Sequence, residues 1–327
     1  MRKFSSTQPI IPFIRETQIK SILTPKIANT LVQKAFAAMA QGFTQMPSKI
    51  YIQLPKGDYR AMPAAFLKPK ALVGIKWVSV YPLNRKQGKP SVIGTMLLND
   101  PQTGELLTVI EANTITAFRT GAAGAIASRH LARKNSTNLL LVGAGTQSYY
   151  QWKCHQEFFN FNQIRIWSPA LDEAKRLCSR LVREGANPQK VDLHPVNDLK
   201  RASLEADIIC TCTPSERPLL LRSWIKEGTH INAIGADAKG KQELDVAILK
   251  SARVFVDDWE QASHSGELNK AVSRSLLHKK DIAGSLGQVI TRQIKGRLND
   301  SQITVFDSTG LAIQDLALAN YLWEHAS

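Results

Sequence analysis

The hydrophobic pattern of the chain begins as a helical one and then changes to short apolar runs. Over residues 25–41 apolar side chains recur on one face, behind Thr24 as the expected cap and Pro25 at the first helical position. Apolar runs separated by turn residues then predict strands. These runs cover residues 49–54, 57–64, 72–82, 92–100 and 106–112.

The last two runs are separated by Asn99-Asp100-Pro101 and Gly104, which predict a hairpin loop. This part of the chain is therefore expected to form an antiparallel or mixed sheet. A long helix is expected from about residue 114 to residue 132, and its many small residues would let neighbouring backbones approach closely.

The second part of the chain alternates apolar strands with helices. This alternation is typical of a parallel, doubly wound sheet, so the expected fold class is α/β. The expected strands are residues 139–143, 164–168, 192–196, 207–213, 229–235 and 252–258, and the expected helices are 147–158, 171–184 and 199–205.

The run LLLVGAGTQS at residues 139–148 follows the first of these strands and opens the first helix. Gly143 allows a tight turn, Gly145 lets the backbone approach a pyrophosphate, and Ser148 replaces the third glycine of the usual fingerprint. The amino-terminal dipole of the helix can hold the phosphates. The pattern predicts a Rossmann-type dinucleotide-binding domain.

The end of the second strand predicts the choice of coenzyme. The chain there is Trp167-Ser168-Pro169, without an Asp or Glu to accept the ribose hydroxyls of NAD. Ser168, with Lys175 or Arg176, is compatible with a 2′-phosphate, although both basic residues also fit a solvated helix face. The expected cofactor is NAD or NADP, with a slight preference for NADP.

Composition adds limits to this picture. The 327 residues are 43% hydrophobic, enough for two domains, and the formal charge is +15. The basic residues are dispersed and not interleaved with aromatics, so we expect a basic surface that attracts an anionic cofactor, without nucleic-acid binding.

The four cysteines lack the paired spacing of a zinc site, so no metal is expected. Free thiols are typical of a reducing cytosol. The amino-terminal segment has no apolar core of signal-peptide length, and no stretch reaches the ~18 apolar residues of a membrane span. We therefore expect a cytoplasmic protein.

Several unusual segments resemble the ornithine cyclodeaminase/μ-crystallin family, and within it most closely the archaeal alanine dehydrogenases. The matching segments are MPSKIYIQLPKGDYRAMPA, VGIKWVSVYP, LLNDPQTG, FRTGAAGAIASRHLARK, VGAGTQS, GTHINAIGADAKGKQELD, VDDWEQASHSGEL and ITVFDSTGLAIQDLA. The resemblance implies a homodimer with an α+β substrate and dimerisation domain, residues 1–120 with 307–327. It implies a dinucleotide-binding domain at residues 121–306, and an active site between the two.

The resemblance assigns roles to four charged residues. Lys76 lies in an apolar strand, where a lysine is rarely unpaired, and would contact the substrate carboxylate or carbonyl and exchange protons. Arg60 and Arg119 match anion-binding arginines, which pair with carboxylates in bidentate fashion. Asp237, just after a strand, would be the general base.

Further positions are implied for substrate and cofactor. Lys49 stands where the ornithine cyclodeaminases carry an arginine, so carboxylate recognition would depend on Arg60, Arg119 and Lys76. The expected cofactor contacts are Arg119, Thr120, Gly143, Gly145, Thr146, Gln147, Ser168, Thr213, Gly235, Ala236, Asp237 and Ser308.

The predicted function is an NAD(P)-dependent amino-acid dehydrogenase, an oxidoreductase that interconverts a small, alanine-like amino acid and its 2-oxo acid plus ammonia. Three alternatives remain open on the same scaffold. They are an ornithine cyclodeaminase, a cyclic ketimine reductase, and a non-enzymatic NADPH-dependent binder of the μ-crystallin type.

Overall fold

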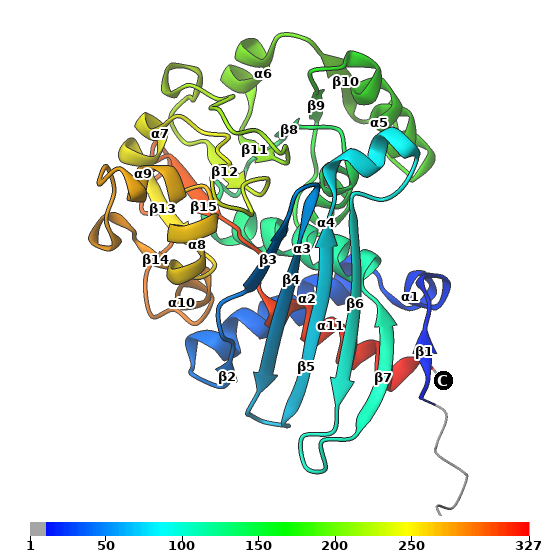
Figure 1. Cartoon of the computed structure of the whole chain (residues 1–327). Coiled ribbons are helices and arrows are strands. Elements are labelled where there is room, and N and C mark those ends of the chain that lie inside the picture. Colours follow the sequence, from blue (N-terminus) through cyan, green and yellow to red (C-terminus); the bar gives the residue numbers. More distant parts are fainter. Residues whose placement is uncertain (1–10, 327) are drawn as a thin grey trace, which may run out of the picture.

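The computed structural model describes residues 11–326, which form two sheets surrounded by helices (Figure 1). Residues 1–10 and 327, which the sequence assigns to the substrate domain, lie outside the described part of the chain. The two sheets correspond to the two hydrophobic patterns of the sequence.

The first sheet has the strand order β1-β7-β6-β5-β4-β2, with β3 paired to β4. Its strands are antiparallel except for β1, which runs parallel to β7. The five predicted strands are confirmed, and the hairpin loop lies between β6 and β7. The strands are β1 (Phe13–Ile14), β2 (Thr44–Gln45), β3 (Ile50–Leu54), β4 (Gly57–Phe66), β5 (Leu72–Val80), β6 (Val92–Asn99) and β7 (Leu106–Glu111).

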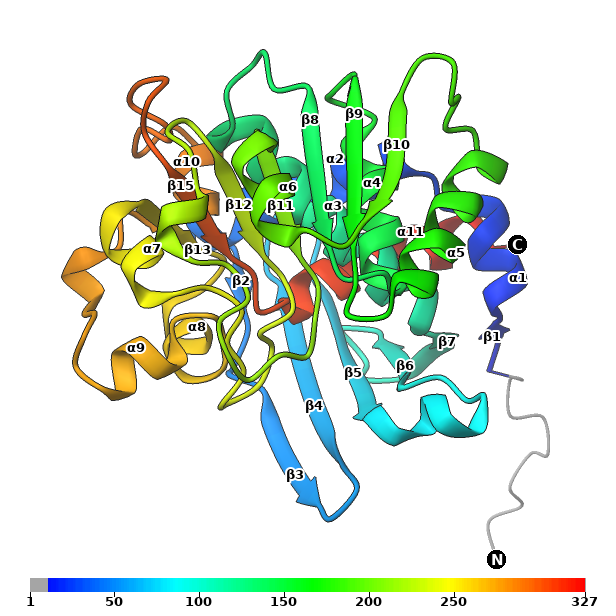
Figure 2. The ribbon, with the colours of Figure 1, turned by 90° about the horizontal axis from the view of Figure 1, so that it is seen from above.

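The second sheet is parallel throughout, with the order β10-β9-β8-β11-β12-β15-β13-β14 (Figure 2). The predicted doubly wound sheet is confirmed, and the winding reverses between β8 and β11. The sequence missed β15, which lies between β12 and β13. The strands are β8 (Asn138–Val142), β9 (Gln163–Trp167), β10 (Asp192–Val196), β11 (Ile208–Thr211), β12 (His230–Ala233), β13 (Arg253–Val256), β14 (Gly284–Ser285) and β15 (Thr304–Asp307).

The helices pack on both sheets. The α-helices are α1 (Glu16–Ile22), α2 (Pro25–Ala40), α3 (Asn113–Leu131), α4 (Thr146–His155), α5 (Leu171–Arg183), α6 (Leu199–Glu205), α7 (Val246–Ser251), α8 (Trp259–Ser265), α9 (Asn269–Ser273), α10 (Leu286–Ile290) and α11 (Ala312–His325). In the described part of the chain the 3-10 helices are η1 (Pro82–Gln87), η2 (Arg222–Trp224) and η3 (Lys279–Asp281). None of the helices in residues 11–326 has the length and apolar character to cross a bilayer.

Helix α3 connects the two halves of the fold. It packs against β6 of the first sheet and against β12 and β15 of the second. A side chain at Gly121 would meet the carbonyl oxygen of Tyr150, and one at Gly124 would meet Gln151, so these glycines permit the close contact with α4. The predicted domain boundary at residue 120 therefore falls inside one helix, and the division into domains stays a prediction.

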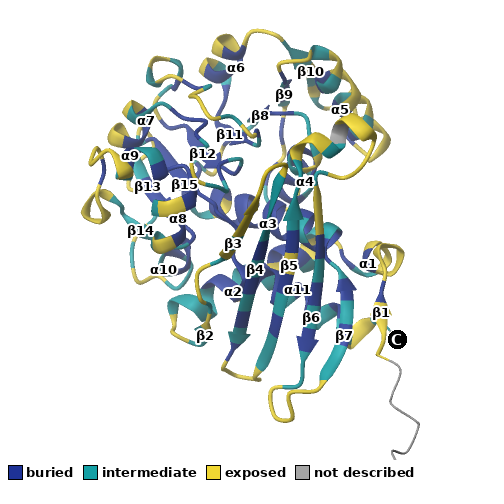
Figure 3. Cartoon of the chain, viewed as in Figure 1, coloured by how far each residue is buried: buried dark blue, intermediate teal, exposed yellow. Residues whose placement is uncertain are grey.

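One face of the first sheet is covered and the other is open (Figure 3). Helix α11 packs on β4, β5 and β6, so their inward residues are buried. The opposite face carries Ala61, Pro63, Ile75 and Leu97, partly exposed, and Trp77, which is 42% exposed. An apolar sheet face of this kind is typical of a protein interface.

Candidate active site

The glycine loop joins β8 to α4 at the point where the winding of the sheet reverses. Gly143 has φ +110°, and a Cβ there would lie 2.9 Å from the carbonyl oxygen of Cys212, so only glycine fits. Ser148 donates a hydrogen bond of 2.8 Å to the Gly143 carbonyl and packs the helix against the turn. Helix α4 begins at Thr146, and the buried Oε1 atom of Gln147 has no partner among the described residues. This loop fits a dinucleotide phosphate.

A carboxylate does lie at the end of the second strand, contrary to the sequence interpretation. The hydroxyl of Ser168, just after β9, donates to Glu173 at 2.8 Å. Glu173 comes from the first turn of α5, and Lys175, a candidate phosphate ligand, pairs with Asp172 at 3.0 Å. The sequence missed Glu173 because the acid comes from the helix after the strand, and its only signal was the LDEA segment at that helix start.

The other predicted cofactor residues of the parallel sheet follow neighbouring strands at its carboxyl edge. Thr213 follows β11, Gly235 and Ala236 follow β12, and Ser308 follows β15.

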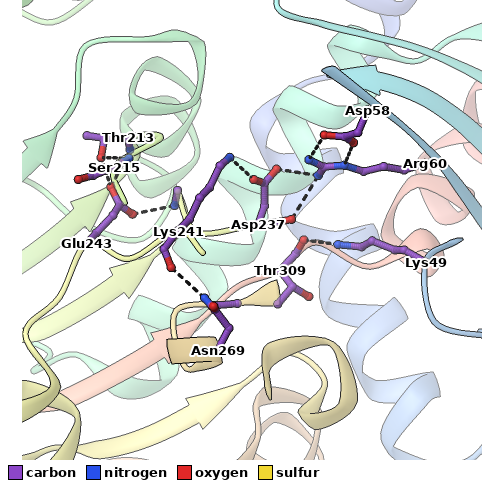
Figure 4. Close-up of polar contacts among 12 residues, drawn as sticks. Lys49, Asp58, Arg60, Thr213, Ser215, Asp237, Lys241, Glu243, Asn269 and Thr309 are labelled. Atoms are coloured by element: carbon purple, nitrogen blue, oxygen red, sulfur yellow. Dashed lines mark hydrogen bonds and ion pairs between the residues drawn. The ribbon is translucent and has the colours of Figure 1, made fainter. Parts of the chain in front are cut away.

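Glu243, missed by the sequence interpretation, joins two of these segments (Figure 4). Its carboxylate accepts from the backbone and the hydroxyl of Thr213, both at 2.7 Å, and from the Gly235 N–H at 2.9 Å. The ends of β11 and β12 are therefore held together by one buried carboxylate.

Two of the predicted cations share a buried acid. Lys76 on β5 pairs with Asp315 of α11 at 2.7 Å, and Arg119 of α3 contacts the other oxygen of Asp315 at 3.4 Å. Lys76 and Asp315 are 1% and 0% exposed. Burial lowers the pKa of Lys76 to about 7, although the charge of Asp315 opposes this. Thr120, next along α3, bonds back to the Thr116 carbonyl.

A second ionic group links the two sheets. Arg60 of β4 contacts Asp237, which follows β12, at 3.0 Å, and contacts Asp58 at 2.6 Å. Lys241 reaches the other oxygen of Asp237 at 2.5 Å (Figure 4). Burial acts to raise the pKa of Asp237, but the charges of Arg60 and Lys241 outweigh it and hold the pKa well below its usual range.

Lys49 lies at the same site but contacts backbone. Its ammonium donates to the Thr309 carbonyl at 2.6 Å, and burial lowers its pKa to about 8. Asp257 holds the Thr309–Gly310 turn from the other side, accepting from both backbone N–H groups at 2.7 and 2.8 Å. A side chain at Gly310 would clash with Arg119, so the turn lies directly against that guanidinium.

The predicted charged residues thus fall into two groups. Asp237, the partner of Arg60, was itself predicted, whereas the further partners Asp315, Asp58 and Lys241 were missed by the sequence interpretation. Asp315 had one local signal, an acid among apolar residues in AIQDLALA. Lys241 and Asp58 had none beyond proximity in sequence to Asp237 and Arg60.

Comparison with known proteins gives consistent matches over nearly the whole chain. Residues 13–327 match the model of the ornithine cyclodeaminase/mu-crystallin family. The alanine dehydrogenase of Archaeoglobus fulgidus is 42% identical over 313 residues, 96% of this chain and 94% of that protein. These matches confirm the resemblance that the motifs predict.

Two solved structures have the same fold. An archaeal alanine dehydrogenase dimer with bound NAD aligns with a TM-score of 0.90 and 41% identity, covering 96% of this chain and 95% of that one. The Δ1-pyrroline-2-carboxylate reductase of Thermococcus litoralis, in complex with NADH and L-proline, aligns with a TM-score of 0.91 and 29% identity, covering 96% and 97%.

The pairing of Asp315 predicts a large effect on stability. Asp315→Asn leaves the buried charge of Lys76 uncompensated, so the free energy of unfolding in urea should fall by about 3 kcal/mol or more. Adding Lys76→Met should recover part of that loss, since it removes the unpaired charge. Glu324→Gln, which breaks an exposed pair on the same helix, should cost less than about 1 kcal/mol. An Asp315→Asn protein as stable as the wild type would contradict this account of the site.

Proposed function

The chain belongs to the ornithine cyclodeaminase/mu-crystallin family, and from this premise we propose that it is a nicotinamide-dependent amino-acid dehydrogenase. It would interconvert a small L-amino acid such as alanine with its 2-oxo acid and ammonia. The observation that carries the proposal is the set of cations, Lys76, Arg60 and Arg119, that face the carboxylates of Asp237 and Asp315. The similarity to the Archaeoglobus alanine dehydrogenase supports the choice of substrate.

The reaction requires removal of a hydride and then hydrolysis. The loop of Gly143 and Gly145 would hold the dinucleotide, which would supply the hydride acceptor, so that the α-carbon of the amino acid becomes an imine. Water adds to the imine carbon as Asp237 accepts a proton, and ammonia leaves as the carbonyl forms. Overall, amino acid, NAD⁺ and water give 2-oxo acid, ammonium, NADH and one proton.

The charged residues have distinct tasks in this scheme. Arg60 and Arg119 hold the substrate carboxylate, since a guanidinium pairs with it through two hydrogen bonds. Lys76, with its pKa near neutrality, gives and takes a proton at the amino or carbonyl group. Lys49 adds a point charge where a cyclodeaminase would place an arginine.

Activity should depend on these groups. Lys76→Met and Asp237→Asn should each lower kcat for alanine oxidation at least about a hundredfold, because each removes a proton-transfer group. The measurement is the absorbance of reduced coenzyme, with NADH binding by fluorescence as the control for folding. Unchanged turnover in either variant would contradict the mechanism. Formation of proline and ammonia from ornithine, without net reduction of the coenzyme, would identify the protein as a cyclodeaminase.

The coenzyme is proposed to be NAD, in place of the NADP that the sequence slightly favoured. Glu173 carries the argument because its carboxylate, bonded to Ser168, can accept a ribose hydroxyl and would repel a 2′-phosphate. Lys175 pairs with Asp172, so its ammonium is less available to bind a 2′-phosphate.

Glu173→Gln tests the choice of coenzyme. The ratio of KM for NADPH to KM for NADH should fall about tenfold, which corresponds to about 1.4 kcal/mol, because the repelling charge is gone. Glu227→Gln removes the same charge from an exposed position just before β12, at the amino ends of the parallel strands. It should leave the ratio of the two KM values unchanged. A wild-type protein that prefers NADPH would overturn the proposal.

A homodimer is proposed, with residues 1–120 and 307–327 as the substrate and dimerisation domain and residues 121–306 as the dinucleotide domain. The open apolar face of the first sheet supports this assembly, and α11 packs on the other face of the same sheet. The similar archaeal structure is itself a dimer.

The oligomeric state can be measured directly. Light scattering should give about twice the chain mass of 36.2 kDa, and Trp77→Glu should give the mass of one chain, because it places a charge in the middle of the open face. Thr103→Glu, in an exposed loop, is the control. If Trp77→Glu stays dimeric, another surface forms the dimer.

A further inference from the structure

Asp237 lies between two cations that come from opposite sides of the site. Arg60 projects from β4 of the first sheet, while Lys241 follows Asp237 by four residues in the loop after β12 (Figure 4). One carboxylate oxygen of Asp237 lies 3.0 Å from the Arg60 guanidinium, and the other lies 2.5 Å from the Lys241 ammonium. The carboxylate is thus fully engaged in the free protein.

The engagement of Arg60 conflicts with its task in the proposed reaction. Its guanidinium is held by Asp237 and Asp58 and lies 5.3 Å from the ring centre of Tyr51. A substrate carboxylate offers the same chemistry as Asp237, so the two compete for Arg60. When the substrate carboxylate pairs with Arg60, Asp237 loses one of its two cationic partners.

We propose that Lys241 is a positioning residue that keeps Asp237 in place as a carboxylate while Arg60 turns from Asp237 to the carboxylate of the substrate. This inference rests on the proposed function and deepens it. Asp237 then enters the reaction with one oxygen held by Lys241 and the other free to accept a proton from water.

The loop holds Lys241 in the required position. Asn269 accepts a hydrogen bond from the Gly240 N–H at 3.0 Å and donates one to the Lys241 carbonyl at 2.8 Å. Gly240 has φ +88°, a conformation that favours glycine. The turn is therefore clamped from both sides, and the lysine side chain extends back to Asp237.

The charge of Asp237 needs this second partner. Its side chain is only 35% exposed, and burial alone would raise its pKa. Besides Arg60 and Lys241, the groups that face it are Lys49 and Tyr51, with Asp58 beside Arg60. Lys49 is engaged by the Thr309 carbonyl, so Lys241 is the cation in direct contact.

The first experiment compares pH profiles of kcat for alanine oxidation at saturating alanine, because kcat reports the ionisation of groups in the substrate complex, where Arg60 has left Asp237. In Lys241→Met the acidic limb should move up by at least about one pH unit, because Asp237 is protonated where the wild type stays ionised. Lys241→Arg should restore the wild-type profile. Lys239→Met removes the same charge from an exposed position of the same loop and should not move it. An unmoved profile in Lys241→Met, or an equal shift in Lys239→Met, would overturn the proposal.

The second experiment is independent of turnover. The variant Arg60→Met imitates the state in which Arg60 has left, and the pKa of Asp237 can be followed there by carbon NMR of labelled aspartate. It should be at least about one unit higher in Arg60→Met with Lys241→Met than in Arg60→Met alone. Equal values would refute the role of Lys241. A wild-type protein that oxidises no amino acid would refute the proposed function, while this measurement would still decide the inference.

Discussion

The buried contact of Asp315 with Lys76 and Arg119 is the interaction on which the rest of the site depends. An ammonium that is 1% exposed is very costly without a counter charge. Asp315 supplies that charge from α11, while the two cations come from β5 and α3. The carboxy-terminal helix is therefore bound to the first sheet by apolar packing and also by charge.

The same principle organises the carboxyl edge of the parallel sheet, where buried carboxylates hold the loops through backbone N–H groups. Glu243 joins the segments after β11 and β12, and Asp257 holds the turn at Thr309. Burial raises the pKa of Asp257 to about 6, although the charge of Lys49 and the backbone donors act to lower it. The positions of these loops are defined because a buried carboxylate accepts hydrogen bonds from the backbone of each loop.

The ion pair between Arg60 and Asp237 adds a dependence on the substrate. It joins the first sheet to the loop after β12, and in the proposed reaction a substrate carboxylate would replace Asp237 at Arg60. In the proposed reaction, recognition and proton transfer are linked, because Arg60 would bind the substrate and also contacts Asp237, the proposed base. Lys241 gives Asp237 a second partner that does not depend on whether Arg60 is paired with Asp237.

The sequence by itself predicted most strands of both sheets, the helices α2 to α6, the dinucleotide loop and five charged residues of the candidate site, Lys49, Lys76, Arg60, Arg119 and Asp237. These follow from local rules, namely hydrophobic period and the conformations open to glycine, together with motifs that resemble a family. Only the tertiary structure decided the partners of those charges and the place of β15 between β12 and β13. Lys76 and Asp315 are 239 positions apart, and which acid meets a buried cation depends on how distant elements pack, a contact that no local pattern encodes.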